Sequence, residues 1–188
     1  MKLAYLVRGL PGHPLHPPLT DLTIGTYSLA TVAAVLDVVG LVERNAAYAW
    51  WIALVVGLCS TALTATTGFI DWIEIEWGSE LWKTATAHLT AMLAATGAFL
   101  AAALLGHTSY SNGTVGSTAF ALTLIGFALL TAGGWLGGTV VFVHGMRVLS
   151  LVGERFPRAA APAPPDDRAE HDERRAPTES TSRRIARS

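Results

Sequence analysis

Four long apolar stretches constrain what this chain can fold into more than any other feature of its sequence. They cover residues 21–42, 48–70, 85–106 and 118–143. The hydrocarbon core of a bilayer is about 30 Å thick and a helix rises about 1.5 Å per residue, so about 20 apolar residues cross it. Short polar or aromatic connectors separate the stretches. The sequence therefore predicts an all-α fold, an integral membrane four-helix bundle.

The composition supports this class and argues against others. Hydrophobic residues make up 51% of the chain and charged residues 14%, and 13 of the 27 acidic and basic residues fall within residues 157–188. The remaining charges are too few to solvate a soluble enzyme of this size. A lone Cys59 excludes an internal disulfide, and a net charge of -1 argues against nucleic acid as a partner. The partner that the composition indicates is the lipid bilayer.

The chain divides into three predicted parts. Residues 1–20 form an interfacial N-terminal segment. It has no small-residue cleavage site, so we do not expect it to be a cleaved signal peptide. Residues 21–148 form the four-span bundle. Residues 157–188 are rich in Pro, Ala, Arg, Asp, Glu and Ser, so they bury too little apolar surface to offset their ordering entropy. We expect them to form a disordered tail.

The distribution of basic residues predicts the orientation of the spans. Four spans place both termini on one side of the membrane. The basic residues close to the spans on that side are Lys2, Arg8, Lys83, Arg147 and Arg155, and the other side has only Arg44. The positive-inside rule then places both termini in the cytoplasm.

Six polar residues are predicted to lie at the end of the bundle that carries the termini, because successive spans alternate in direction. They are His13, His16, Asp21, Asp71, His88 and His144. Ionisable groups at membrane depth are costly unless they are paired, ligated or turned inward. Imidazole and carboxylate groups are also ligands for iron, copper and zinc. The six residues are therefore candidate ligands of a transition metal.

The run His13-Pro14-Leu15-His16-Pro17-Pro18 offers two of these imidazoles. Its three prolines disfavour a continuous helix and predict a stiff loop that presents both histidines. Two histidines at this spacing can share one metal ion. They can equally cap the bundle end by bonding to backbone carbonyls. The spacing alone does not distinguish metal ligation from capping.

A glycine stripe in the fourth stretch suggests a second kind of site. Gly133 and Gly137 lie on nearly the same helical face as His144. Such a groove can admit a flat macrocycle, which predicts haem b with His88 and His144 as axial ligands. The competing interpretation is close helix packing, the commoner role of glycines four residues apart.

Two motifs give the chain a family resemblance. The run GHPLHP at residues 12–17 is followed by Ile24-Gly25, and GWLGG at residues 134–138 is followed by VFVHG at residues 141–145. Asp71-Trp72 lies between them. With these motifs, residues 10–148 resemble a bacterial membrane-protein family known as domain of unknown function 2231.

The resemblance implies a four-span protein of the bacterial inner membrane with no established reaction. Some relatives carry a Rieske-type iron–sulfur domain, which implies a Rieske-type or other redox partner; this chain lacks the two cysteines that such a centre needs. Family members often have proline, glutamate and a basic residue at the positions of Thr23, Thr139 and Val143, so this chain departs from them there.

Three functions remain open from the sequence. The first is a redox or electron-transfer protein that binds haem b or a transition metal. The second is a non-catalytic accessory or scaffold protein, and the third is a proton or metal-ion transporter, in which a homo-oligomer could complete the path. No nucleophile with an adjacent base and no nucleotide-binding motif is visible, so the sequence leaves open whether the protein is an enzyme.

Overall fold

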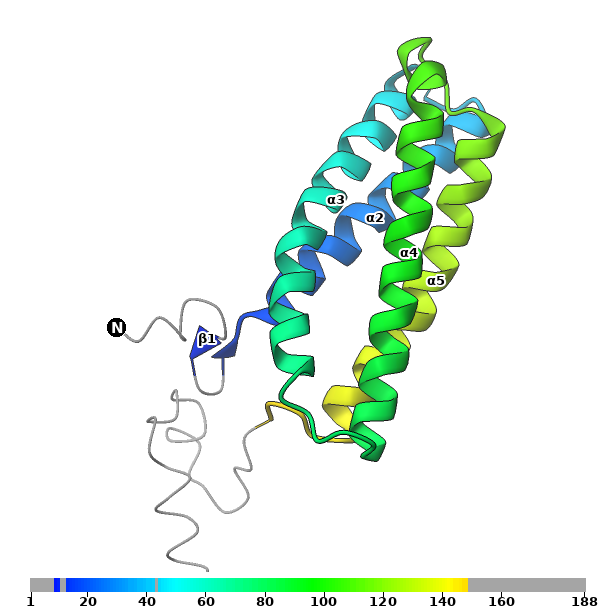
Figure 1. The fold of residues 1–188 in the computed structure, drawn as a ribbon. Helices are drawn as coiled ribbons and strands as arrows, with labels where there is room; N and C mark the ends of the chain where they lie inside the picture. Colours follow the sequence, from blue (N-terminus) through cyan, green and yellow to red (C-terminus); the bar gives the residue numbers. More distant parts are fainter. Residues whose placement is uncertain (1–8, 11–12, 43, 149–188) are drawn as a thin grey trace, which may run out of the picture. The chain divides into compact units, whose positions relative to one another are not determined.

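The structure is a computed structural model, and it describes residues 9–10, 13–42 and 44–148. Its main feature is a bundle of four helices, α2 (His16–Val38), α3 (Arg44–Trp72), α4 (Glu80–Ser111) and α5 (Ser117–Phe142) (Figure 1). All four are long and apolar enough to cross a membrane. The predicted four-helix membrane bundle is therefore confirmed. Two short paired strands, β1 (Gly9–Leu10) and β2 (His13–Pro14), precede it.

Helix α2 begins at His16, earlier than the predicted start at Asp21, and this corrects the prediction of a loop there. Pro17 and Pro18 occupy the first turn of the helix. Backbone N–H groups in a first turn have no partner within the helix, so a proline costs nothing there. The prolines therefore start α2 rather than prevent it, and His16 is held by a helix.

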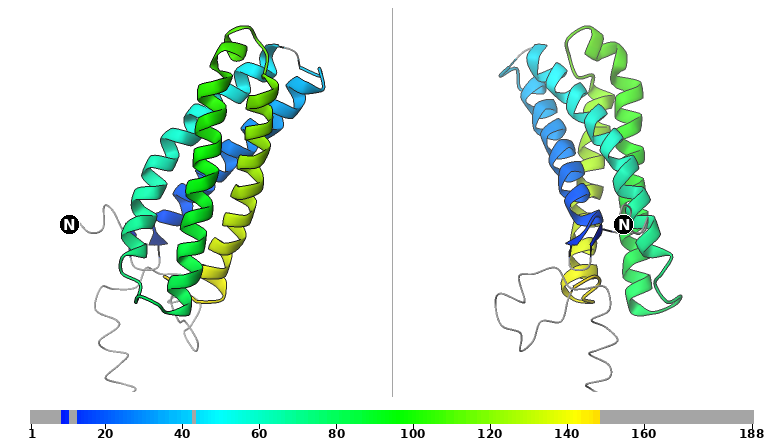
Figure 2. Two further views of the ribbon diagram at one scale, coloured as in Figure 1. Left: turned by 45° about the vertical axis from the view of Figure 1, so that its right-hand side comes forward. Right: turned by 90° about the vertical axis from the view of Figure 1, so that its left-hand side faces the viewer.

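The helices pack mainly as two antiparallel pairs. Contacts are most numerous between α2 and α3 and between α4 and α5, and far fewer between the pairs. Figure 2 shows the helices of the bundle from two further sides. We call the end where α2 and α4 begin, and where α3 and α5 end, the histidine end. The opposite end is the distal end.

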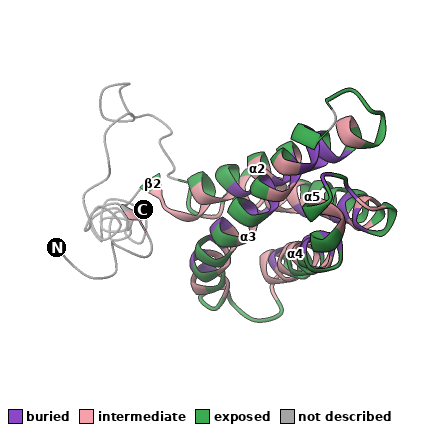
Figure 3. Cartoon of the chain, turned by 90° about the horizontal axis from the view of Figure 1, so that it is seen from above, coloured by how far each residue is buried: buried purple, intermediate pink, exposed green. Residues whose placement is uncertain are grey.

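The apolar core occupies the distal half of the bundle. Each helix contributes small residues, with a few large rings among them, and the buried parts of the helices face the interior of the bundle (Figure 3). Tyr27 and Phe99 stack with ring centroids 4.0 Å apart at the middle of the bundle. The cluster comprises Tyr27, Ala30, Ala33, Ala34, Ala47, Trp50, Ala53, Leu54, Ala95, Phe99, Ala102, Ala103, Val115, Ala119 and Leu130.

Trp50 is a core residue. Its side chain is 0% exposed, and its indole N–H donates to the Thr123 hydroxyl at 3.1 Å. Gly106 makes room for the ring, because a Cβ there would lie 2.5 Å from the ring and 2.8 Å from the Cβ of Ala119. Trp50 therefore joins the two helix pairs and does not stand at a lipid interface.

Polar contacts close the distal end. A carboxylate oxygen of Asp37 accepts a hydrogen bond from the backbone N–H of Val115 at 2.7 Å. Arg44 lies over Gly113, whose positive φ of 82° suits glycine in a tight turn. Asp37 thus holds the turn between α4 and α5.

The bundle belongs to one unit of the chain, made of residues 1–9 and 14–148, and residues 10–13 with 149–188 make up another. Of the second unit, the structure describes residues 10 and 13. The predicted tail at 157–188 lies outside the described residues.

Candidate functional site

The interior of the histidine half differs in kind from the distal core. Its buried side chains are small or polar, and within the described residues no aromatic ring, leucine, isoleucine or methionine is buried there. Gly133 is also buried at this level of α5. The buried side chains of this half are Thr23, Ser60, Thr64, Thr67, Asp71, Ala85 and Val140.

His16 lies against helix α3 in this half. Its Nδ1 is 3.0 Å from the carbonyl oxygen of Thr64, and a carbonyl only accepts, so the ring carries its proton on Nδ1. The Thr20 hydroxyl, 3.5 Å from Nε2, donates its proton to the His16 carbonyl instead. Nε2 therefore keeps its lone pair. The ring rests on Gly68, where any Cβ would lie 2.6 Å from it.

His88 is held in the same way on the other helix pair. Its Nδ1 is 2.7 Å from the carbonyl oxygen of Gly133, so Nδ1 again carries the proton. The ring packs on Gly137, where a Cβ would lie 2.9 Å from it. Nε2 has no hydrogen-bond partner among the described residues. Every buried side-chain nitrogen of the described residues has a hydrogen-bond partner, so the Nε2 of His88, which has none, is not buried.

His144 presents the opposite nitrogen. Its Nε2 is 3.1 Å from the hydroxyl of Thr84, which donates its own proton to the Glu80 carbonyl. The hydroxyl must then accept from Nε2–H. Thr84 and His88 are one turn apart on α4, so His88 and His144 both lie along the contact between α4 and α5.

The two glycine pairs of α5 face different ways. A Cβ on Gly133 would lie 2.7 Å from the sulfur of Met92, and Gly137 faces His88. Apart from its chain neighbours and the backbone of its own helix, nothing described lies within 4 Å of a Cβ on Gly134, and a Cβ on Gly138 meets only Phe142 of the same helix. The groove of the first pair is therefore filled by side chains of α4.

A group of hydroxyls joins α2 to α3 between His16 and the middle of the bundle. Thr23 bonds to Ser60 at 3.0 Å and to Thr64 at 2.9 Å. One turn further in, the Tyr27 hydroxyl lies 2.9 Å from that of Thr61. Hydroxyls that also donate to their own helix carbonyls are typical of close interhelical contacts in membranes.

Asp71 is paired with a cation at the mouth of the bundle. Its carboxylate forms a short ion pair with Arg147, which follows α5. The same guanidinium lies 3.7 Å from a carboxylate oxygen of Glu74. Arg147 has a left-handed backbone, with φ 61°. The pair links α3 to the segment after α5 and so joins the two helix pairs at this end.

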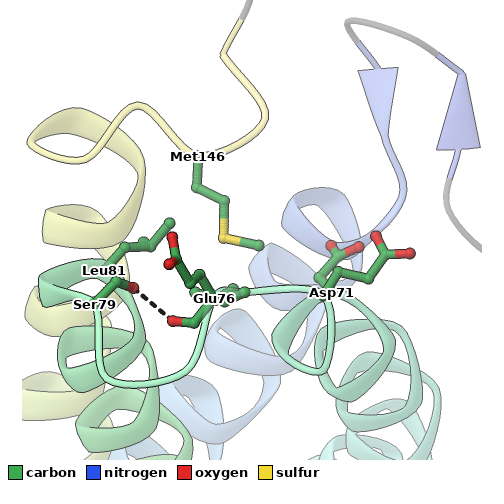
Figure 4. A pocket seen from close by; sticks show the side chains of 7 residues that line it. Asp71, Glu76, Ser79, Leu81 and Met146 are labelled. Atoms are coloured by element: carbon green, nitrogen blue, oxygen red, sulfur yellow. Dashed lines mark hydrogen bonds between the residues drawn. The ribbon is translucent and has the colours of Figure 1, made fainter.

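A pocket of about 380 Å³ opens beside this ion pair. Met146 reaches into it between Leu81 and Asp71, with Glu76 alongside (Figure 4). The hydroxyl of Ser79 is engaged, because it donates to the Glu76 carbonyl and accepts from the Trp82 N–H. The pocket lining comprises Asp71, Glu74, Ile75, Glu76, Ser79, Leu81 and Met146.

The structure brings together some of the predicted site residues. His88 and Asp71 both lie within electrostatic range of the His16 ring. Asp21 is exposed on α2, and His13 belongs to the second unit. Within residues 9–10, 13–42 and 44–148, no three His, Cys, Asp or Glu side chains are grouped closely enough for a metal ion. A haem needs only two protein ligands, because the porphyrin supplies the others.

The family model for "Predicted membrane protein (DUF2231)" matches residues 12–150. The chain belongs to the DUF2231 family. The match covers the whole bundle, from just before His16 to just after Arg147. This DUF2231 chain matches none of the curated proteins and none of the solved structures with which it was compared.

Two features of this DUF2231 protein were missed by sequence reasoning. From the sequence, Arg147 is only a charge that sets orientation, although alternation of the spans places it at the same end as Asp71. Thr64 and Gly133 act through their backbone carbonyls, which every residue has. No sequence signal marks such a carbonyl, so only the fold identifies them as the partners of His16 and His88.

Proposed function

We propose that this membrane protein binds haem b between its two helix pairs and transfers electrons. Nε2 of His16 and Nε2 of His88 would hold the haem iron. A bound haem b supplies one-electron chemistry between its ferric and ferrous states. The rest of the site is built by the chain itself.

The observation that carries the proposal is the matching arrangement of the two imidazoles. Each ring donates its Nδ1–H to a backbone carbonyl, at 3.0 Å for His16 and 2.7 Å for His88. Histidines that ligate metals commonly hold their second nitrogen in this way, which fixes the ring and makes the ligating nitrogen more basic. Both Nε2 atoms are thereby left as oriented lone pairs.

The packing of the histidine half supports the same proposal. His16 sits on the α2–α3 pair and His88 on the α4–α5 pair, and contacts between the pairs are few. The large buried rings and leucines lie in the distal half and at the middle of the bundle. Small side chains line the interior of the histidine half. A flat apolar group could therefore pack there, between the two helix pairs.

This pair of ligands is favoured over the predicted pair of His88 and His144. His88 and His144 both lie along one contact between adjacent helices, and Nε2 of His144 is engaged by Thr84, so these two residues would not hold a group between the helix pairs. His16 comes from the other helix pair. Gly133 and Gly137 then serve to seat the His88 ring, rather than to admit the macrocycle.

The setting of the site follows the predictions from sequence. We propose a location in the bacterial inner membrane with both termini in the cytoplasm, on the side of Lys83 and Arg147. A Rieske-type or other redox protein is the proposed partner. The pocket beside Asp71 opens at the same end as the two histidines.

Haem content tests the proposal. The full chain is produced in a haem-replete host and purified in detergent without a polyhistidine tag, and haem is measured per chain from the visible absorption spectrum. Wild type is expected to hold about one haem per chain. His16→Ala and His88→Ala are each expected to lose most of it.

His107→Ala is the matched control, because His107 lies exposed at the distal end. It is expected to keep the wild-type haem content. A colourless wild-type protein, or equal haem content in all four proteins, would overturn the proposal.

One observation favours the accessory or scaffold alternative. Every buried side-chain nitrogen and oxygen of the described part has a hydrogen-bond partner without any added group. In that case the His16 and His88 bonds serve only to join helices. Wild type would then be colourless, and His16→Ala and His88→Ala would lower thermal stability.

A further inference from the structure

We propose that the ion pair of Arg147 with Asp71 sets the reduction potential of the two-histidine site, so that Arg147 is a positioning and tuning residue. This inference rests on the proposed haem function and adds to it the control of the same site. Arg147 does not ligate the iron in this account; it acts through Asp71.

The geometry places Asp71 beside the site. Thr64, Thr67, Gly68 and Asp71 follow one another at helical spacing on one face of α3, and the first three contact the His16 ring. Asp71 therefore lies one turn beyond those contacts, and it is buried. A buried carboxylate acts on its neighbours more strongly than a surface one, because water screens it less.

Arg147 is held in place to offset that charge. Its backbone is left-handed, with φ 61°, a conformation that is unfavourable for a residue other than glycine. Its ion pairs with Asp71 and Glu74 offset this cost. The other described basic residue of this end, Lys83, pairs with Glu80 on the exposed face of α4. The two cations thus differ in what they neutralise.

The sign of the effect follows from charge. An uncompensated carboxylate near the iron stabilises the more positive, oxidised form and lowers the potential. Arg147→Gln removes the compensating cation, so its midpoint potential is expected to fall. Asp71→Asn leaves the cation, so its potential is expected to rise. A single charge at this range is expected to change the ratio of reduced to oxidised haem about tenfold, or about 59 mV for one electron.

Potentiometric titration of the haem-loaded full chain in detergent tests this. Arg147→Lys keeps the charge and is expected to stay close to wild type, and the double variant Arg147→Gln with Asp71→Asn is expected to return toward it. Lys83→Gln is the matched control, with no expected shift. Thermal unfolding of each variant is measured alongside, because a purely structural role would move stability without opposite shifts in potential.

The outcomes separate the two proposals. Haem bound normally, with Arg147→Gln and Asp71→Asn at the wild-type potential or shifted in the same direction, overturns this inference and leaves the haem proposal standing. Equal shifts in Arg147→Gln and Arg147→Lys overturn it too. Wild-type protein without haem overturns both.

Discussion

The two halves of the bundle hold their helices together by different means. In the distal half, alanines bring the helices close around Trp50, Tyr27, Phe99 and Leu54, all of them fully or almost fully buried. In the histidine half, hydroxyls, two imidazoles and an ion pair make the links, and no comparable ring among the described residues is buried there. One half is therefore packed for stability, and the other keeps oriented polar groups.

This difference shows which part of a small membrane bundle can hold oriented polar groups. Lipid tails are as apolar as leucine, so close packing and polar links, rather than a hydrophobic driving force, hold the helices together in a bilayer. The distal half supplies the packing. That leaves the histidine half free to use small residues and polar contacts, with His16 and His88 on opposite helix pairs.

The largest expected effect tests the distal core. Trp50→Ala removes a fully buried ring and its bond to Thr123, and should lower the free energy of unfolding by about 3–5 kcal/mol. Trp77→Ala, at 78% exposed, is the control and should change it by less than about 0.5 kcal/mol. Unfolding of both variants would be followed in detergent. Equal losses would show that the distal ring is not a core residue.

A second comparison uses two adjacent glycines of α5. Gly133→Val places a side chain against Met92 and should cost about 1–3 kcal/mol of stability. Gly134→Val meets no described atom within 4 Å and should be nearly neutral in the monomer. The readout is thermal unfolding in detergent. If Gly134→Val were less stable than Gly133→Val, the packing described between α4 and α5 would be wrong.

The smallest expected effect tests the polar links of the histidine half. Thr23→Val removes the hydroxyl that bonds to Ser60 and Thr64, and interhelical bonds of this kind contribute about 0.6 kcal/mol in membranes. Thr66→Val is the matched control, since the Thr66 hydroxyl is exposed and bonds only to its own helix. If Thr23→Val lowered the free energy of unfolding by several times the expected amount, this half would also rely on tight packing.

Much of the fold could be predicted from sequence because it depends on length and hydropathy. Four stretches long enough to cross a bilayer, joined by short connectors, fix the alternation of helices and so the depth of His16, Asp71, His88 and His144. The start of α2 was missed because two prolines in sequence read as a helix breaker, although a first turn tolerates them.

The direction in which each side chain points could not be predicted. The four helices are apolar all round, so hydropathy does not separate a lipid-facing tryptophan from a core one such as Trp50. For the same reason the inward pair Gly133 and Gly137 could not be told from Gly134. Which nitrogen of each histidine is engaged depends on the partners that packing supplies.

We propose that His16 and His88, from opposite helix pairs, hold one haem. The most direct test is electron paramagnetic resonance of the oxidised full chain with His16→Ala, His88→Ala and His144→Ala. The account predicts a low-spin ferric signal in wild type and in His144→Ala, and its conversion to high spin or loss in the other two. Low-spin His16→Ala with a converted His144→Ala would contradict it.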